Sequence, residues 1–225
     1  MARLIHQRLA TSFIILLFLM LIVVFILVSI DLIGLAFVKL GFPSQFAVLF
    51  LLLSLLGSYV NIPVKEIASR EPVISGQVID FYWFRYVIPP IEIERHTIIA
   101  VNLGGAVFPV IISGFLITKV NLADALIGVL IMTLLIHLMA KPVRGLGIAV
   151  PALLPPIMAA LVALLISPHD APMIAYISGT LGSLIGADLL NLKKIPELRT
   201  SVASIGGAGT FDGIFLTGII SVLLS

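Results

Sequence analysis

Long apolar runs separated by short polar connections dominate the chain. A helix needs about 20 mostly apolar residues to cross a membrane, and seven segments meet this requirement. They are residues 11–30, 44–64, 97–118, 122–140, 147–167, 171–190 and 204–224. Only the connection at residues 65–96 is long, so the pattern predicts an all-α, polytopic helical membrane protein that forms a single domain over residues 1–225.

The composition supports this prediction and excludes other classes. The chain is 60% hydrophobic and 11% charged, with a mean hydropathy of +1.25, which leaves too few polar side chains to cover a soluble globule. The expected partner is therefore a lipid bilayer, and the expected location is the cell membrane. No basic stretch with interleaved aromatic residues predicts a nucleic-acid partner. No feature of the sequence indicates a particular oligomeric state.

The positive charges predict the orientation of the seven segments. Loops on the cytoplasmic side of a membrane carry an excess of Lys and Arg. With the seven segments above, all of the 13 Lys and Arg residues except Lys39 and Lys119 fall on the side that holds the N-terminus. The sequence therefore predicts a cytoplasmic N-terminus and a C-terminus outside.

The long connection contains "VIDFYWFRYV", with five aromatic residues between Val78 and Val87, followed by the alternating "IEIER". Aromatic residues and alternation predict a short β-hairpin or strands at the membrane interface. Two roles fit this stretch: an aromatic belt that anchors the loop among lipid headgroups, or an edge strand that pairs with an extended substrate.

A few polar or helix-breaking residues fall inside the predicted spans, where charged side chains are costly and usually serve a function. The main ones are Asn102, Asp188 and Asp212, and the Pro-Ala-Leu stretch made of Pro151, Ala152 and Leu153 lies at a similar depth. The topology places all of them in the cytoplasmic third of the membrane. This shared depth predicts one site.

The last span begins with "GGAGTFDGIF" at residues 206–215, where Gly207, Gly209 and Gly213 surround Asp212. Glycine permits an unwound backbone and close helix contacts, and broken helices in membranes are tolerated where they line a cavity. The stretch is typical of a helix start that presents Asp212 to a polar partner.

The spacing of small residues predicts that the sixth and seventh spans are neighbours, because Gly182-to-Gly186 and Gly209-to-Gly213 both match the pattern of close helix contacts. In a regular helix, Asp188 lies about 200° around the axis from Gly186. If those glycines contact the seventh span, Asp188 points away from Asp212. The two aspartates meet only if the helix unwinds near Ala187 or packs through another face.

Two carboxylates on neighbouring helices can form a dyad that activates water. Zinc and cysteine chemistry are not supported, because the chain has no Cys, no HExxH motif and only scattered histidines. No metal and no cofactor are therefore expected.

The segment "GAGTFDGIF" at 207–215 resembles the Gly-x-Gly-Asp motif of presenilin and signal peptide peptidase type intramembrane aspartyl proteases, and "PAL" at 151–153 is similar to their Pro-Ala-Leu motif. The spacing differs, since Thr210 and Phe211 lengthen the first motif and the second precedes the aspartates. The resemblance implies catalytic roles for Asp188 and Asp212 and a transmembrane peptide as substrate. The whole chain also resembles a family of prokaryotic polytopic membrane proteins without an established activity.

Other interpretations of the same residues stay open. Asp212 in a broken helix could bind a cation or relay a proton in a transporter or channel. The protein could also be a membrane scaffold without chemistry, in which Asp188 ends a helix at the interface, Asp212 occupies a first helical turn, and Asn102 marks a kink.

Overall fold

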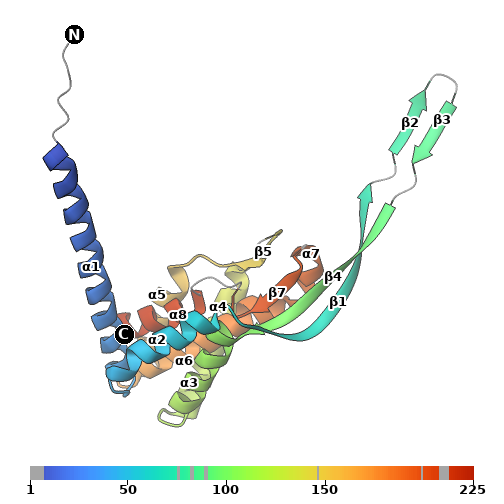
Figure 1. The fold of residues 1–225 in the computed structure, drawn as a ribbon. Helices are drawn as coiled ribbons and strands as arrows, with labels where there is room; N and C mark the ends of the chain where they lie inside the picture. The colour runs from blue at the N-terminus through green and yellow to red at the C-terminus, as the bar shows by residue number, and fades with distance from the viewer. Residues whose placement is uncertain are drawn as a thin grey trace.

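The computed structural model describes residues 8–74, 77–81, 84–88, 91–145, 147–198, 200–207 and 213–225, and most of them are helical (Figure 1). The helices are α1 (Arg8–Lys39), α2 (Gln45–Gly57), α3 (Phe108–Ile117), α4 (Leu122–Met139), α5 (Leu154–Ile166), α6 (Ala171–Ser183), α7 (Ile195–Leu198) and α8 (Gly213–Leu224). Short π-helical or 3₁₀ segments are η1 (Leu103–Val107), η2 (Leu184–Asp188) and η3 (Leu189–Lys194). The strands are β1 (Asn61–Ile74), β2 (Gln77–Phe81), β3 (Phe84–Ile88), β4 (Ile91–Asn102), β5 (Lys141–Val143), β6 (Gly147–Ala149) and β7 (Val202–Ile205).

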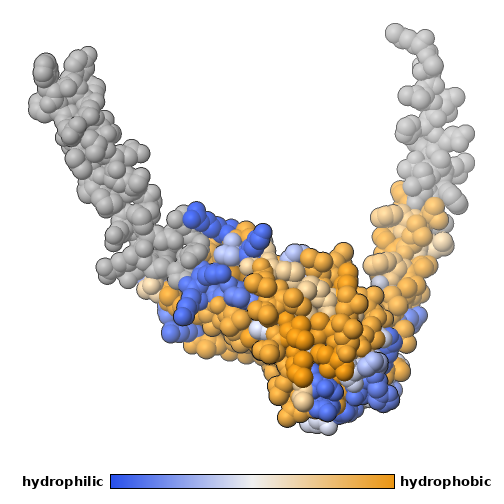
Figure 2. Space-filling view, turned by 180° about the vertical axis from the view of Figure 1, so that it is seen from behind, coloured by the Kyte–Doolittle hydropathy of each residue, from blue (hydrophilic) through white to orange (hydrophobic). Residues whose placement is uncertain are grey.

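Three described helical segments are long and apolar enough to cross a membrane: Leu17–Lys39 in α1, Leu122–Met139, and Ala171–Lys194, which runs from α6 through η2 to η3. The window in α1 is only 11% buried. Hydrophobic residues cover most of the molecular face in Figure 2, while hydrophilic residues gather in separate patches. Such a surface suits lipid rather than water as its surroundings.

The predicted boundaries of four spans are wrong, because each of these segments contains a strand at one end. Strands occupy the last residues of 44–64 and the first residues of 97–118, 147–167 and 204–224. The helix α2, for example, has 13 residues and therefore rises only about 20 Å, less than the hydrocarbon core of about 30 Å. Hydropathy measures how apolar a segment is and does not distinguish a helix from a strand that is paired inside the protein.

The hairpin predicted at residues 65–96 is present and is longer than expected. β1 pairs antiparallel with β4 from Asn61 opposite Asn102 to Ile74 opposite Ile91, and β2 pairs with β3. β7 then joins β4 in parallel, so the sheet has the order β1-β4-β7. In Figure 1 the hairpin and α1 leave the helical body on opposite sides. The side chains of the aromatic stretch lie outside the described part of the chain.

Helix α6 is the centre of the helical body and contacts α3, α4, α5 and α8. It is therefore a neighbour of α8, as predicted, but the predicted contact residues are wrong. A Cβ atom on Gly182 would lie 2.6 Å from Cβ of Met132, and one on Gly186 would lie 3.1 Å from the backbone N of His137, so both glycines face α4. The contact between α6 and α8 instead uses Gly179, which approaches Thr217.

The two basic residues expected outside lie at one end of the body. Lys39 donates to the carbonyls of Val222 and Leu223, which end α8, at 3.2 and 3.4 Å. Lys119 lies 4.5 Å from the ring centroid of Phe115. Cations at a helix C-terminus and over aromatic rings are favourable contacts. The structure thus places both lysines at the end of the body where α8 terminates.

Gly104 of η1 lies so close to the backbone of α2 that a larger residue there should destabilise the protein. Ser54 Oγ donates to the Gly104 carbonyl at 3.0 Å, and a Cβ on Gly104 would clash with the carbonyl oxygen of Ser54. Gly104→Ala should therefore lower the free energy of unfolding by about 1–3 kcal/mol, the usual cost of overpacking. Gly114→Ala in α3 is the control, since nothing lies within 4 Å of its added Cβ. Thermal unfolding in detergent should show a loss only for the first variant; equal melting temperatures would contradict this close approach.

Candidate functional site

Asp188 is the last residue of η2, where the long helix that begins as α6 changes from α- to π-helical and then to 3₁₀ geometry. Its side chain is partly buried, and its Oδ2 accepts a hydrogen bond from the backbone N–H of Gly206 at 2.8 Å. A single π-turn in a helix is frequent at functional sites. The π-helical segment includes Ala187, near which the sequence predicts unwinding as one of two ways for the aspartates to meet.

The direction of Asp188 follows from the packing of the glycines. Because Gly182 and Gly186 face α4, the opposite side of the helix faces the segment that leads from β7 into α8. Asp188 lies on that opposite side and meets Gly206. The geometric objection raised by the sequence therefore does not apply, since it assumed that the glycines contact the seventh span.

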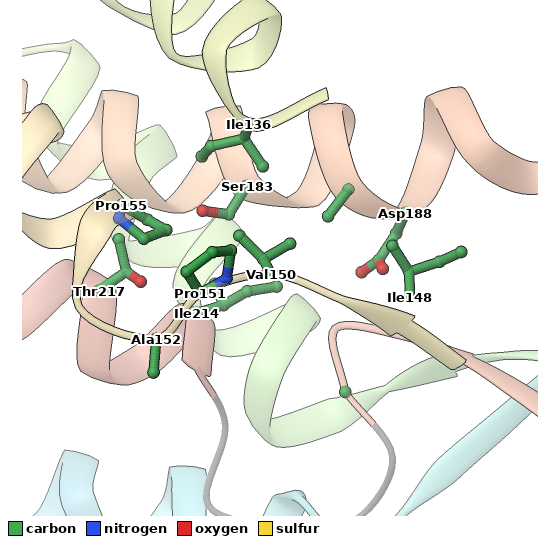
Figure 3. Close-up of a pocket in the computed structure, with 12 residues that line it drawn as sticks. Ile136, Ile148, Val150, Pro151, Ala152, Pro155, Ser183, Asp188, Ile214 and Thr217 are labelled. Atoms are coloured by element: carbon green, nitrogen blue, oxygen red, sulfur yellow. The ribbon is translucent and has the colours of Figure 1, made fainter. Parts of the chain in front are cut away.

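Beside Asp188 lies a cavity of about 190 Å³. Figure 3 shows the Asp188 carboxylate pointing from its helix toward the segment of Ile148 and Val150. Four parts of the chain form the walls: α4, the segment from β6 to the start of α5, the helix α6–η2, and the region around the start of α8. The lining residues are Ile136, Ile148, Val150, Pro151, Ala152, Pro155, Ser183, Ala187, Asp188, Gly207, Ile214 and Thr217.

Two residues of the Pro-Ala-Leu stretch, Pro151 and Ala152, line this cavity together with Asp188. Leu153 does not line it and has 69% of its side chain exposed. Proline lacks a backbone N–H and favours the first turn of a helix, which is where Pro155 and Pro156 begin α5. Pro151 thus follows β6 and Pro155 lies in the first turn of α5, and both line the cavity.

The predicted catalytic residue Asp212 and the neighbouring Gly209 lie outside the described residues. The described residues on either side of that segment, Gly207 and Ile214, both line the cavity. Gly213, the first residue of α8, lies in the sequence between that segment and Ile214. Two described parts of the glycine-rich region are therefore at the same cavity as Asp188.

Asn102 lies in a different cluster, at the root of the hairpin, and does not line the cavity. It is 1% exposed, and its Nδ2 donates to the Ser58 carbonyl at 2.7 Å and to Asn61 Oδ1 at 3.1 Å. Its Oδ1 accepts from the Gly105 N–H, so it caps η1. Asn61 Oδ1 also accepts from Ser204 Oγ at 2.6 Å. Asn102 therefore binds Asn61, which in turn binds Ser204 of β7 at the hairpin root. Ser204 precedes Gly206 by two residues.

The sequence prediction missed Asn191, which is 1% exposed and follows Asp188 by three residues. Its Nδ2 donates to the carbonyls of Gly186 and Ala187 at 3.2 and 2.8 Å. His137 Nδ1 lies 3.2 Å from the Gly186 carbonyl as well. These contacts place two polar side chains on backbone carbonyls of the π-helical segment η2. The spacing of an acid and an amide three residues apart was the only signal in the sequence.

Within the described ranges, no group of three or more His, Cys, Asp or Glu side chains is arranged to hold a metal ion. The oxygen-containing side chains that line the cavity of about 190 Å³ are those of Asp188, Ser183 and Thr217. These groups can bind and polarise water through a carboxylate and two hydroxyls.

Comparison with known proteins identifies one family. The model of the family described as "Protein of unknown function (DUF1614)" matches residues 55–224, which include the hairpin, the cavity and both aspartates. No curated protein and no solved structure matches the chain.

Gly206 directly follows β7 and donates its backbone N–H to Asp188. Its surroundings predict that it tolerates no side chain. Its φ is +89°, and an added Cβ would lie 2.7 Å from Cβ of Ala106. Gly145 has a similar φ of +77° but nothing within 4 Å of an added Cβ. Gly145→Ala should therefore cost about 1–2 kcal/mol for the left-handed backbone alone, whereas Gly206→Ala should cost about 1–3 kcal/mol more through overpacking.

Chemical unfolding of both variants in the same detergent measures this difference. Equal destabilisation of Gly145→Ala and Gly206→Ala would contradict the close approach of Gly206 to η1.

Proposed function

This chain belongs to the DUF1614 family, and we propose that it is an intramembrane aspartyl protease-like hydrolase that cleaves a membrane-embedded peptide with Asp188 and Asp212. The observation that carries the proposal is the composition of the cavity wall. Asp188, the Pro151–Ala152 turn, Gly207 and Ile214 line one space of about 190 Å³. A cavity of that size is large enough for several water molecules.

In this proposal the two carboxylates share the acid–base work. One accepts a proton from a water molecule as its oxygen attacks the peptide carbonyl carbon, and the other, protonated, donates to the carbonyl oxygen. The C–N bond then breaks, and the nitrogen leaves as an amine after receiving a proton. Two nearby carboxylates cannot both stay ionised in a site of low dielectric, which gives them the two different protonation states that the reaction needs.

The strands near Asp188 favour an extended substrate. β7 is an edge strand of the β1-β4-β7 sheet, and β6 is an edge strand of the β5–β6 pair. Ile148 of β6 lines the cavity of about 190 Å³ together with Asp188, and β7 leads through Gly206 into Gly207, which lines the same cavity. A peptide can bind to a free strand edge through main-chain hydrogen bonds. Extended backbone is also the form in which a peptide bond is accessible to water.

Movement of a cation or proton is the second candidate. Ser183 and Thr217 line the cavity with Asp188, and hydroxyl and carboxyl groups together can relay a proton. The two candidates differ in their products, since a protease leaves peptide fragments and a transporter leaves an ion gradient changed.

The activity test uses purified protein in liposomes with a set of synthetic single-span peptides, and mass spectrometry to detect fragments. The wild-type protein should cleave at least one peptide, and Asp188→Asn and Asp212→Asn should each lower the rate about 100-fold or more, because a general acid or base contributes that much. Asp124→Asn, in the first turn of α4, is the matched control and should cleave normally. Unchanged cleavage by Asp188→Asn would remove this residue from the mechanism.

The proposed topology has seven crossings, with the N-terminus in the cytoplasm and the C-terminus outside. The shared position of Lys39, Lys119 and the end of α8 supports it. The backbone N–H of Gly145 donates to the Leu198 carbonyl at 2.7 Å, so the basic turn around Arg144 lies beside the end of α7. Both of these regions are on the side predicted to be cytoplasmic.

Because the chain has no Cys, single cysteines report this topology without background. Thr118→Cys and Arg144→Cys both replace exposed residues. In intact cells a membrane-impermeant maleimide should label the first variant and not the second, which should react only after the membrane is permeabilised. Labelling of Arg144→Cys alone would invert the proposed orientation.

A further inference from the structure

Asp188 also borders a second, smaller cavity of about 40 Å³. The polar side chains in its wall belong to Asp188, Asn191 and Ser204, and the other lining residues are Gly147, Ile148, Leu192, Ile195, Leu198, Ala203 and Ile205. Asp188 and Asn191 are three residues apart at the start of the 3₁₀ segment η3. Asp188 is the N-cap of η3 and Asn191 is its third residue, and both line this cavity.

Asn191, one of the residues that line this cavity, carries an unpaired side-chain oxygen atom. Its Nδ2 group is used by the carbonyls of Gly186 and Ala187, which determines the orientation of the amide. Its Oδ1 atom is buried and has no hydrogen-bond partner among the described residues. A buried acceptor without a partner is costly and needs an explanation, such as a bound water molecule or ion.

The charge of Asp188 is also uncompensated in the described part of the chain. No described Lys, Arg or His forms an ion pair with it; the described ion pair joins His96 and Glu66. A carboxylate in an apolar environment is unfavourable unless a positive charge or several hydrogen bonds accompany it. The hydrogen bond from Gly206 contributes one donor.

We propose that the small cavity binds one monovalent cation, held by the Asp188 carboxylate, Asn191 Oδ1 and the Ser204 hydroxyl oxygen. Ser204 Oγ donates its proton to Asn61, which leaves its lone pairs available to a cation. One carboxylate balances a single positive charge. Interrupted helices in membrane proteins bind such ions through oxygen atoms near the break. The cavity has room for one ion or a water-sized group and little else.

The test uses Na⁺ itself as the probe and purified wild-type protein in detergent. Thermal unfolding is measured while NaCl replaces choline chloride at constant ionic strength and constant chloride. A ligand that binds only the folded state raises the free energy of unfolding by RT ln(1 + L/Kd), where L is the ligand concentration and Kd the dissociation constant. The melting temperature should therefore rise by about 3–6 °C at ten times the dissociation constant.

Two variants separate the site from general salt effects. Asp188→Asn keeps the size of the side chain and removes the charge, so its melting temperature should not respond to Na⁺. Asp124→Asn removes a charge elsewhere and should respond like the wild type. Ser204→Ala should move the Na⁺ response to higher concentration, because one ligand is lost. Binding of ²²Na⁺ to the wild-type protein should approach one ion per chain.

A wild-type melting temperature that is equal in NaCl and choline chloride would overturn the cation site and favour a water molecule or a protonated Asp188. An equal response in Asp188→Asn would overturn it as well. The readouts involve no peptide, so a failed Na⁺ response and failed proteolysis are separate results.

Discussion

The close contact of α6–η2 with α4 is the constraint on which the rest of the site depends. Gly182 and Gly186 permit this contact, since a Cβ on Gly182 would lie 2.6 Å from Cβ of Met132 and one on Gly186 would lie 2.5 Å from the Thr133 carbonyl oxygen, both closer than van der Waals contact. With one side of the helix committed to α4, the opposite side faces β7 and the start of α8. Asp188 is on that side, where Gly206 binds it and the large cavity opens. Packing of small residues thus determines where the acid points.

The second constraint is that backbone groups in a membrane need hydrogen-bond partners inside the protein. The short helices α2, α3 and α8 lie next to strand segments, and the sheet β1-β4-β7 pairs these strands with one another. The cluster of Asn61, Asn102 and Ser204 joins the strands at the hairpin root. This sheet brings Gly206 to Asp188 from a part of the chain that follows it by 18 residues. Broken helices and a paired sheet therefore act together to bring Gly206 and Asp188 into contact.

The sequence predicted the class of protein and the hairpin, because hydropathy and alternation are local properties. It also selected Asp188, Pro151, Ala152 and Gly207, which line one cavity. It could not predict the strands at the ends of four spans, since β1, β4 and β7 pair with distant residues and β6, which pairs with the nearby β5, has only three residues. It gave Gly182 and Gly186 the wrong neighbour because glycine spacing identifies a face of a helix and not the helix that packs there. Asn191 was missed because its role depends on the change from π to 3₁₀ geometry.

The central claim is that Asp212 meets Asp188 at the cavity, and cross-linking of paired cysteines in this cysteine-free chain measures it most directly. A disulfide requires Cα atoms about 4.4–6.8 Å apart. Ser113→Cys with Thr180→Cys is the positive control, because the two hydroxyl oxygens are 2.9 Å apart. Asp188→Cys with Asp124→Cys is the negative control, because Asp124 lies about 20 Å along α4 from His137. The account predicts that Asp188→Cys cross-links to Asp212→Cys under mild oxidation as the positive control does; a pair that stays reduced like the negative control would contradict it.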